Sequence, residues 1–214
     1  PEGFEYDERH HNCSGKHSGF LAYCALHDLP AETYTDLTHP LQLQVRKAVA
    51  DVAGIASEDL AWGIVGCSAP NFAMPLSNLA QAYAHLAQPE SNNEYGSSLK
   101  LLGEAMSAHP ELVSGTGRSD ADFMRVGRGD WVTKVGADGV QVIASRARGQ
   151  ALAIKIADGN KPALFAASVE ALDQLGWLDS EQREALKPWR SAGLKNIKGA
   201  EVGERRSIFK IQTT

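Results

Sequence analysis

The stretch DWVTKVGADGVQVIAS, Asp130–Ser145, indicates the fold class. Its two runs of β-forming residues flank the dipeptide Asp138-Gly139, which is typical of a hairpin turn. A third run, ALAIKIA at Ala151–Ala157, follows closely, so we expect an antiparallel meander. Helical patterns dominate the chain before this stretch, without strand–helix–strand alternation. The sequence therefore predicts an α+β fold in which an antiparallel sheet packs with helices.

Helical periodicity is clear on both sides of the meander. The expected helices follow the motif HHNCSGKH and run from about Thr38 to Val52, Pro75 to Leu86, Ser98 to Ala108, Pro162 to Leu175 and Ser180 to Pro188. We expect Thr38 to cap the second of these helices and Gly54 to end it. Ser119 and Asp122 have the spacing of a capping box before another short helix.

Two further strands are expected outside the meander. Trp62–Val65 is a short apolar run that we interpret as a buried strand, which delivers Gly66 and Cys67 to a surface. Glu204–Ile211 is interpreted as a last strand. A chain of 214 residues without internal repeats is expected to form a single domain, residues 1–214.

The composition excludes several classes of partner. The chain carries 21 basic and 26 acidic residues, a net charge of −5, and no block of like charges, so nucleic acid and membrane surfaces are poor candidates. No apolar run approaches the roughly 18 residues needed to span a bilayer. Three cysteines cannot all pair and are too few for a disulfide scaffold. We therefore expect reduced thiols and a cytoplasmic location.

The motif NCSGKH places three reactive side chains within one turn of chain. Cys13 and Lys16 are three residues apart and His17 is adjacent, so all three can share one side of a helix or tight loop. A nearby ammonium favours the thiolate form of a cysteine. The alternative interpretation is a buried thiol beside a solvated lysine and histidine.

Cys67, in GCSAPN, follows the expected strand and is a second cysteine that could face a pocket. If it meets Cys13, three outcomes are open: an inert apolar pair, a disulfide, or a metal site, for which zinc is the usual ion with sulfur ligands. A metal site would need another ligand. The nearby candidates are His10, His11, His17 and a neutral Lys16.

Two cations in the second half of the chain are candidates for substrate contacts. Lys134 lies on an expected strand among alternating apolar neighbours, where its ammonium could bind an anion or stabilise an alkoxide. Arg118, in GTGRSD, could clamp a carboxylate. The alternatives are a surface lysine on an edge strand and a charge at the start of a helix.

Four segments, in this order, resemble the asparaginase II family, the asparaginases of the type described from Rhizobium. They are HHNCSGKHSGFLA from His10, GCSAPNFAMPLSNLA from Gly66, AHPELVSGTGRSD from Ala108 and DWVTKVGADGVQVIA from Asp130. The resemblance extends from about His10 to Ile211, nearly the whole chain. Four matching motifs in one order are far more specific than any single motif.

The resemblance implies a fold similar to serine β-lactamases and penicillin-binding proteins. It implies hydrolysis of L-asparagine to L-aspartate and ammonia through a serine acyl-enzyme, and a homodimer. It also implies a zinc ion held by Cys13, Lys16 and Cys67, a substrate pocket lined by His17, and a catalytic contribution from Lys134.

The family's two catalytic serines, in a Ser-x-x-Lys motif and a Ser-His-Ser-Gly-like segment, precede the NCSGKH motif and are not found here. Ser97 and Lys100 have the Ser-x-x-Lys spacing, but they begin an amphipathic helix far from the expected order. The opening PEGFEYDERHHN has neither an initiator methionine nor a leader. We therefore expect the chain to be the C-terminal two-thirds of a larger β-lactamase-like domain, with the nucleophile upstream of Pro1.

One position departs from the family pattern, which has an acidic residue two positions before the second cysteine. This chain has Val65 there, and valine cannot hold a substrate amine as a carboxylate can. Two other functions are therefore kept open: another amide or ester hydrolase of the same fold, or a catalytically silent zinc-binding or dimerisation module.

Overall fold

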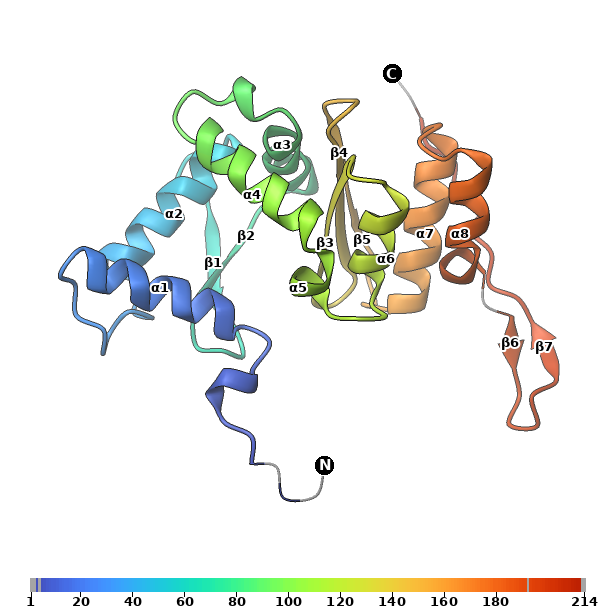
Figure 1. The fold of residues 1–214 in the computed structure, drawn as a ribbon, viewed down its shortest axis with the longest axis horizontal. Helices are drawn as coiled ribbons and strands as arrows, with labels where there is room; N and C mark the ends of the chain where they lie inside the picture. Colours follow the sequence, from blue (N-terminus) through green and yellow to red (C-terminus); the bar gives the residue numbers. More distant parts are fainter. Residues whose placement is uncertain (1–2, 4, 192, 213–214) are drawn as a thin grey trace. The chain divides into compact units, whose positions relative to one another are not determined.

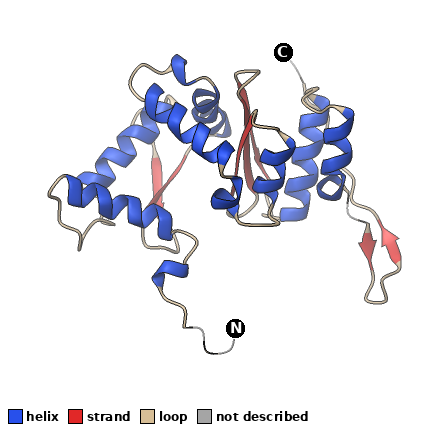
Figure 2. Cartoon of the chain, in the orientation of Figure 1, coloured by secondary structure: helices blue, strands red, loops and turns tan. Residues whose placement is uncertain are grey.

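A computed structural model of the chain describes residue 3 and residues 5–191 and 193–212. The chain divides into two compact units, Pro1–Pro75 and Leu76–Thr214. Within the described residues, eight α-helices accompany three small antiparallel sheets (Figures 1 and 2), which confirms the predicted α+β class. The expected single domain and its β-lactamase-like topology stay predictions.

The first unit contains two α-helices, a short 3-10 helix and a two-stranded sheet. Its elements are η1 Glu8–His10, α1 Ser14–Leu26, α2 Pro40–Ala53, β1 Ala61–Ile64 and β2 Pro70–Ala73. The N-cap of α2 is His39, whose Nδ1 accepts the amide of Leu41 at 3.2 Å, so the prediction that Thr38 caps this helix was wrong. Gly54 ends α2 in the left-handed conformation, as expected.

Strand β1 of the first unit is exposed. All four residues of β1 are exposed, so the prediction of a buried strand was wrong. Among the described residues this strand pairs with β2 alone, from Ala61 opposite Ala73 to Ile64 opposite Pro70. Sequence reasoning did not anticipate β2, because Pro70 has no amide hydrogen for a ladder; proline is tolerated here as the first residue of the strand. The hairpin brings residues 65–69 to its tip.

The second unit is built around the predicted meander. Its elements are α3 Leu76–Ala87, η2 Pro89–Ser91, α4 Gly96–Ala108, α5 Pro110–Ser114, α6 Ser119–Val126, β3 Trp131–Gly136, β4 Val140–Ser145, β5 Gln150–Lys155, α7 Lys161–Gln174, α8 Ser180–Arg190, β6 Leu194–Lys195 and β7 Glu201–Gly203. The strand order β3-β4-β5, antiparallel throughout, confirms the meander. Asp138 and Gly139 turn between β3 and β4 with φ of 54° and 75°, which suits a type I′ hairpin.

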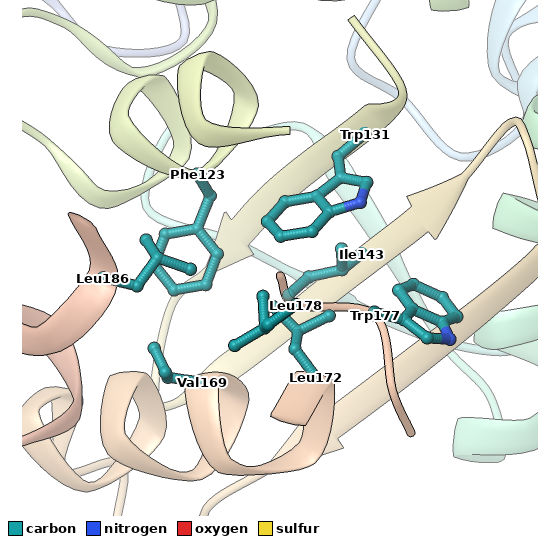
Figure 3. Packing of buried hydrophobic residues seen from close by; sticks show 8 residues of the cluster. All are labelled: Phe123, Trp131, Ile143, Val169, Leu172, Trp177, Leu178 and Leu186. Carbon is teal, nitrogen blue, oxygen red and sulfur yellow. The ribbon is translucent and has the colours of Figure 1, made fainter. Parts of the chain in front are cut away.

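The main core of this unit lies between the meander and α6–α8 (Figure 3). Trp131 from β3 and Ile143 from β4 pack with Phe123 of α6, Leu172 of α7 and Leu186 of α8. Because successive strand residues face opposite sides, the alternate residues of β3 and β4 cannot join this cluster. Three of them, Val132, Val142 and Ala144, are nevertheless buried, and α3 packs against β4 and β5 (Figure 1). The sheet is therefore covered by helices on both faces.

The start of α6 differs from the predicted capping box. Arg118 is the N-cap and provides no side-chain cap, while Ser119 is the first helical residue and is buried. The amide of Ala121 donates instead to Ser114 Oγ at 3.0 Å. The prediction that Ser119 and Asp122 form a capping box was therefore wrong, because a serine from α5 takes over the capping bond.

The predicted last strand is also absent from the described segment Glu204–Ile211. The amide of Ile211 donates to Gln174 Oε1 at 2.8 Å, and Gln174 Nε2 donates to the carbonyl of Phe209 at 3.0 Å. The backbone of this segment thus bonds to a side chain of α7 and not to another strand. The only terminal pairing in the described part of the chain is the short hairpin of β6 and β7, which precedes it.

Candidate functional site

The tip of the β1–β2 hairpin presents Cys67. The amide of Ser68 donates to the carbonyl of Val65 at 2.8 Å, and the amide of Val65 donates to the carbonyl of Ala69 at 3.3 Å. Ser68 adopts a φ of 67°, in the left-handed region that side chains other than glycine rarely occupy. This tight turn holds Cys67 half-buried at the end of the hairpin.

The first turn of α1 brings the second half of the site. Cys13 is the N-cap of α1 and makes no side-chain cap bond, and Lys16 and His17 follow within the first turn. Residues three and four apart lie on the same face of a helix, as the sequence indicated. Lys16 Nζ donates to Cys67 Sγ at 3.3 Å, across 51 residues of sequence.

The Cys67 thiol has a lower pKa than an ordinary cysteine. Burial alone would raise its pKa, but the neighbouring His17, the amide of Ala69, Lys16 and Cys13 together outweigh this and lower the pKa to about 6. A cysteine with this pKa is mostly thiolate at neutral pH, which is the form that binds metals and acts as a nucleophile. Cys13 thus belongs to the surroundings of Cys67, as the sequence hypothesis required.

His17 also contacts the aromatic side chain of Tyr34. Its Nδ1 lies 2.6 Å from Tyr34 Oη, and the two rings meet edge to face with centroids 5.5 Å apart. The buried Nε2 of His17 makes no hydrogen bond of standard geometry with any described residue. Lys16 Nζ also lies 5.9 Å from the ring centroid of Phe20.

A cavity of about 680 Å³ adjoins these groups within the first unit. Its lining includes Tyr6, His10, His17, Tyr34, Gly66 and Cys67. Large pockets with mostly apolar walls and a few polar groups are the usual form of small-molecule sites. This cavity is therefore the candidate binding pocket of the first unit.

The structure bears on the three outcomes considered for Cys13 and Cys67: an apolar pair, a disulfide or a metal site. Cys13, Cys24 and Cys67 are all free thiols, so no disulfide joins Cys13 to Cys67. Among the described residues, no group of three or more His, Cys, Asp and Glu side chains is arranged to hold a metal ion. The set Cys13, Lys16 and Cys67 is of a different kind, because one of its three donors is an amine.

The two neighbouring histidines have other partners. His11 Nδ1 accepts the amide of Cys13 at 3.1 Å, and His10 Nδ1 accepts the amide of Asp7 at 3.1 Å. Each ring therefore has its Nδ1 bonded to local backbone.

Lys134 and Arg118 belong to the second unit. Lys134 Nζ donates to the carbonyl of Val135 at 2.6 Å and lies 3.9 Å from Asp120 Oδ2. Its side chain is 43% exposed. Arg118 is exposed at the N-cap of α6. Their roles in catalysis and substrate binding stay predictions.

Comparison with known families decides the family of the chain. The sequence profile described as L-asparaginase II matches residues 1–207. The chain belongs to the L-asparaginase II family. This confirms the predicted resemblance, and membership in this family suggests an amidohydrolase that acts on a small-molecule substrate. A search of curated proteins found no match to the chain.

In this asparaginase II chain, sequence reasoning missed Tyr34 and Asp120. Tyr34 lies in the irregular segment between α1 and α2, and no motif marks it. Asp120 lies two residues after Arg118 in GTGRSD, so its motif was visible, but its burial was not. Both residues contact predicted site residues: Tyr34 contacts His17, and Asp120 pairs with Lys134.

Val65, at the hairpin tip, offers an apolar side chain where the resemblance led us to expect an acid. No helix in the described part of the chain combines the length and apolarity needed to cross a membrane.

Proposed function

We propose that the protein is an L-asparaginase, which hydrolyses L-asparagine to L-aspartate and ammonia. The observation that carries the proposal is the match of residues 1–207 to the L-asparaginase II family. The contact between Lys16 and Cys67 supports it, because two motifs of the family meet there in space. The proposed fold is β-lactamase-like and the proposed assembly is a homodimer.

The proposed mechanism is acyl transfer through a serine. The serine hydroxyl attacks the side-chain amide carbon of asparagine, ammonia leaves, and water then hydrolyses the acyl-enzyme to aspartate. We assign the attacking serine to no residue of this chain. Two pairs have the Ser-x-x-Lys spacing: Ser97 with Lys100 in the first turn of α4, and Ser207 with Lys210 in the segment that bonds to α7. Neither pair occurs in the order of the family motifs.

Lys134 is proposed to stabilise negative charge during this reaction. Its half-exposed ammonium stands on the edge strand β3, and a cation beside the reacting carbonyl stabilises the oxyanion of the tetrahedral intermediate. Arg118 is proposed to bind the substrate carboxylate. His17 is proposed to line the substrate pocket, held by Tyr34 at the wall of the cavity.

Zinc is proposed as the metal of the Cys13, Lys16 and Cys67 set. The donors fit a zinc ion, because the Cys67 pKa is lowered to about 6 and thiolates are the ligands that zinc prefers. The amine of Lys16 is already directed at the Cys67 sulfur, and as a ligand it would have to be neutral. When bound, zinc would supply positive charge beside His17. The contact between Lys16 and Cys67 joins α1 to the hairpin tip, and Cys67 also lines the cavity.

The function is tested by measuring ammonia and aspartate released from L-asparagine. The assay is run on the 214-residue chain and on any longer form that its gene encodes, with L-glutamine as the comparison substrate. Equal amounts of ammonia and aspartate are the expected result. Absence of both products from every form would contradict the proposal. Acylation by a β-lactam probe would instead favour another amide hydrolase of the same fold.

A second candidate is a catalytically silent zinc-binding or dimerisation module. Val65 favours it, because this side chain cannot hold a substrate amine by charge. Elemental analysis distinguishes the two proposals: bound zinc without turnover would support the silent module, whereas zinc together with ammonia release would support the enzyme.

A further inference from the structure

Asp120 is a buried acid that the proposed reaction does not use. It is 0% exposed, at the start of α6. Thr133 Oγ1 and Gln141 Nε2 each donate to its Oδ1 at 3.0 Å, and the amide of Val135 donates to its Oδ2 at 2.8 Å. Buried carboxylates are costly to desolvate, so a protein that keeps one normally pairs it.

Lys134 is the cation that pairs with this acid. Its Nζ lies 3.9 Å from Asp120 Oδ2, and no other described cation forms an ion pair with Asp120. The same Nζ donates to the carbonyl of Val135 at 2.6 Å, while the amide of Val135 donates to Asp120. Both backbone groups of Val135 are thus bound, one by each partner of the ion pair.

The topology explains why the acid can reach this position. β3 is the edge strand of the meander, so no strand in the described part of the chain bonds to its outer side. Asp120 covers that edge from α6, with hydrogen bonds from Thr133 and Val135 on either side of Lys134. Burial, and then the charge of Asp120, raise the pKa of Tyr83, which lies near this edge of the sheet.

We propose that Asp120 is a positioning residue for Lys134. A long, half-exposed lysine side chain could adopt several conformations. The buried carboxylate of Asp120 attracts the Lys134 ammonium and holds it at the edge of β3, over the Val135 carbonyl. The importance of this positioning for catalysis rests on the proposed function, which gives Lys134 its role in stabilising negative charge. The pairing itself is tested without any activity measurement.

Chemical labelling of lysines on the intact protein tests the positioning. Amines are acetylated briefly under native conditions, and modification at each lysine is measured by mass spectrometry. Lys155 is the internal reference: its Nζ donates to the carbonyls of Asp138 and Ile156, both at 2.6 Å, and it forms no ion pair with a described carboxylate. Asp120→Asn keeps an acceptor oxygen but removes the charge.

The expected result is an increase of about two- to fivefold in the labelling of Lys134 relative to Lys155 in Asp120→Asn, the range that loss of a partly exposed ion pair allows. Asp122→Asn is the matched control on the same helix, because Asp122 accepts bonds from Arg125 and Trp189. That control should leave the ratio unchanged. An unchanged ratio in Asp120→Asn, or the same change in both variants, overturns the proposal.

A second pair of variants decides the question if Asp120→Asn does not fold. Lys134→Gln leaves Asp120 buried without its cation and should lower the folding equilibrium constant about tenfold or more. Lys155→Gln should change it by less than about threefold, as for most surface substitutions. Equal effects of the two substitutions overturn the pairing. Absence of asparagine hydrolysis would count against the proposed function only, because neither readout depends on activity.

Discussion

Lys16 Nζ donates a hydrogen bond to Cys67 Sγ at 3.3 Å, although 51 residues separate the two in sequence. The contact joins the first turn of α1 to the tip of the β1–β2 hairpin. Cys13 and His17 act on the same sulfur, and together they lower the pKa of Cys67 against the opposing effect of burial. The four residues therefore form one electrostatic unit inside the first half of the chain.

Replacing Lys16 with methionine should weaken zinc binding. The substitution keeps an unbranched side chain of similar length but removes the nitrogen donor. Loss of even an outer-shell partner costs about 10- to 100-fold in metal affinity, and loss of a direct ligand should cost at least as much. Competition with a chromogenic zinc chelator measures the affinity. Lys47→Met is the control, because Lys47 pairs with Asp51 on the neighbouring helix α2; equal affinities in the two variants would rule Lys16 out as a ligand.

In the metal-free protein, alkylation of Cys67 should follow a thiolate titration centred near pH 6. The thiolate is the reactive form, so the rate should rise with pH to a plateau by about pH 7. Lys16→Met should move the midpoint upward, because one of the hydrogen bonds that lower the pKa is lost. Peptide mapping after iodoacetamide pulses follows the site, with buried Cys24 as the unreactive internal reference. A midpoint near the ordinary cysteine value of about 8.5 would contradict the proposed environment.

The two glycines Gly127 and Gly19 should respond in opposite ways to replacement by alanine. A Cβ at Gly127 would lie 2.6 Å from Cγ of Trp131, a residue of the main core, so Gly127→Ala should destabilise the protein by about 1–3 kcal/mol. At Gly19, inside α1, a Cβ meets nothing within 4 Å, so Gly19→Ala should stabilise the helix by about 0.5–1 kcal/mol. Urea denaturation measures both; a stabilising Gly127→Ala would show that Trp131 is packed differently.

Much of the second unit was predictable because its signals are local. The meander follows from alternating apolar residues around Asp138 and Gly139, whose positive φ values suit the hairpin turn. The expected strand at Glu204–Ile211 failed because strand formation also needs a partner edge, and Gln174 occupies the backbone groups of Phe209 and Ile211. Period and propensity show what a segment could form, and tertiary partners decide what it forms.

The candidate site was also predictable only in part. The spacing of Cys13, Lys16 and His17 predicted a shared face, and the structure places all three around Cys67. α1 and Cys67 are far apart in the sequence, so no local pattern indicates that they are in contact. That contact was implied only by the family resemblance. Tyr34 was missed because a single aromatic residue in an irregular segment has no pattern, although its hydroxyl binds His17.

Stability at acid pH should depend on Asp173. Hydrogen bonding to Arg183 and the charges of Arg183 and Arg190 lower its pKa in the folded protein, against the effect of burial. The folded state then holds its proton less tightly than the unfolded chain, where the pKa is near 3.8. Its contribution is therefore complete above about pH 5 and is lost as the pH falls through the folded value.

Asp173→Asn should accordingly lower the free energy of unfolding by about 1–2 kcal/mol at pH 7, with the difference from wild type shrinking toward pH 2. The side chain is 20% exposed, which makes this pair stronger than a surface one. Glu184→Gln is the comparison, since Glu184 and Lys187 form an exposed pair whose loss should have little effect. Denaturation curves across pH measure both, and a difference that grows on acidification would reverse the predicted sign.

The most direct test of the central claim is the rate of ammonia release from L-asparagine by wild type and by Cys67→Ser, measured side by side in the longest form of the protein that its gene encodes. We predict that the wild type releases ammonia and that Cys67→Ser is slower by about tenfold or more, because serine does not supply the thiolate on which Lys16, His17 and Cys13 converge. Equal rates in the two proteins, or no ammonia from the wild type, would contradict the claim that this cluster belongs to an asparaginase site.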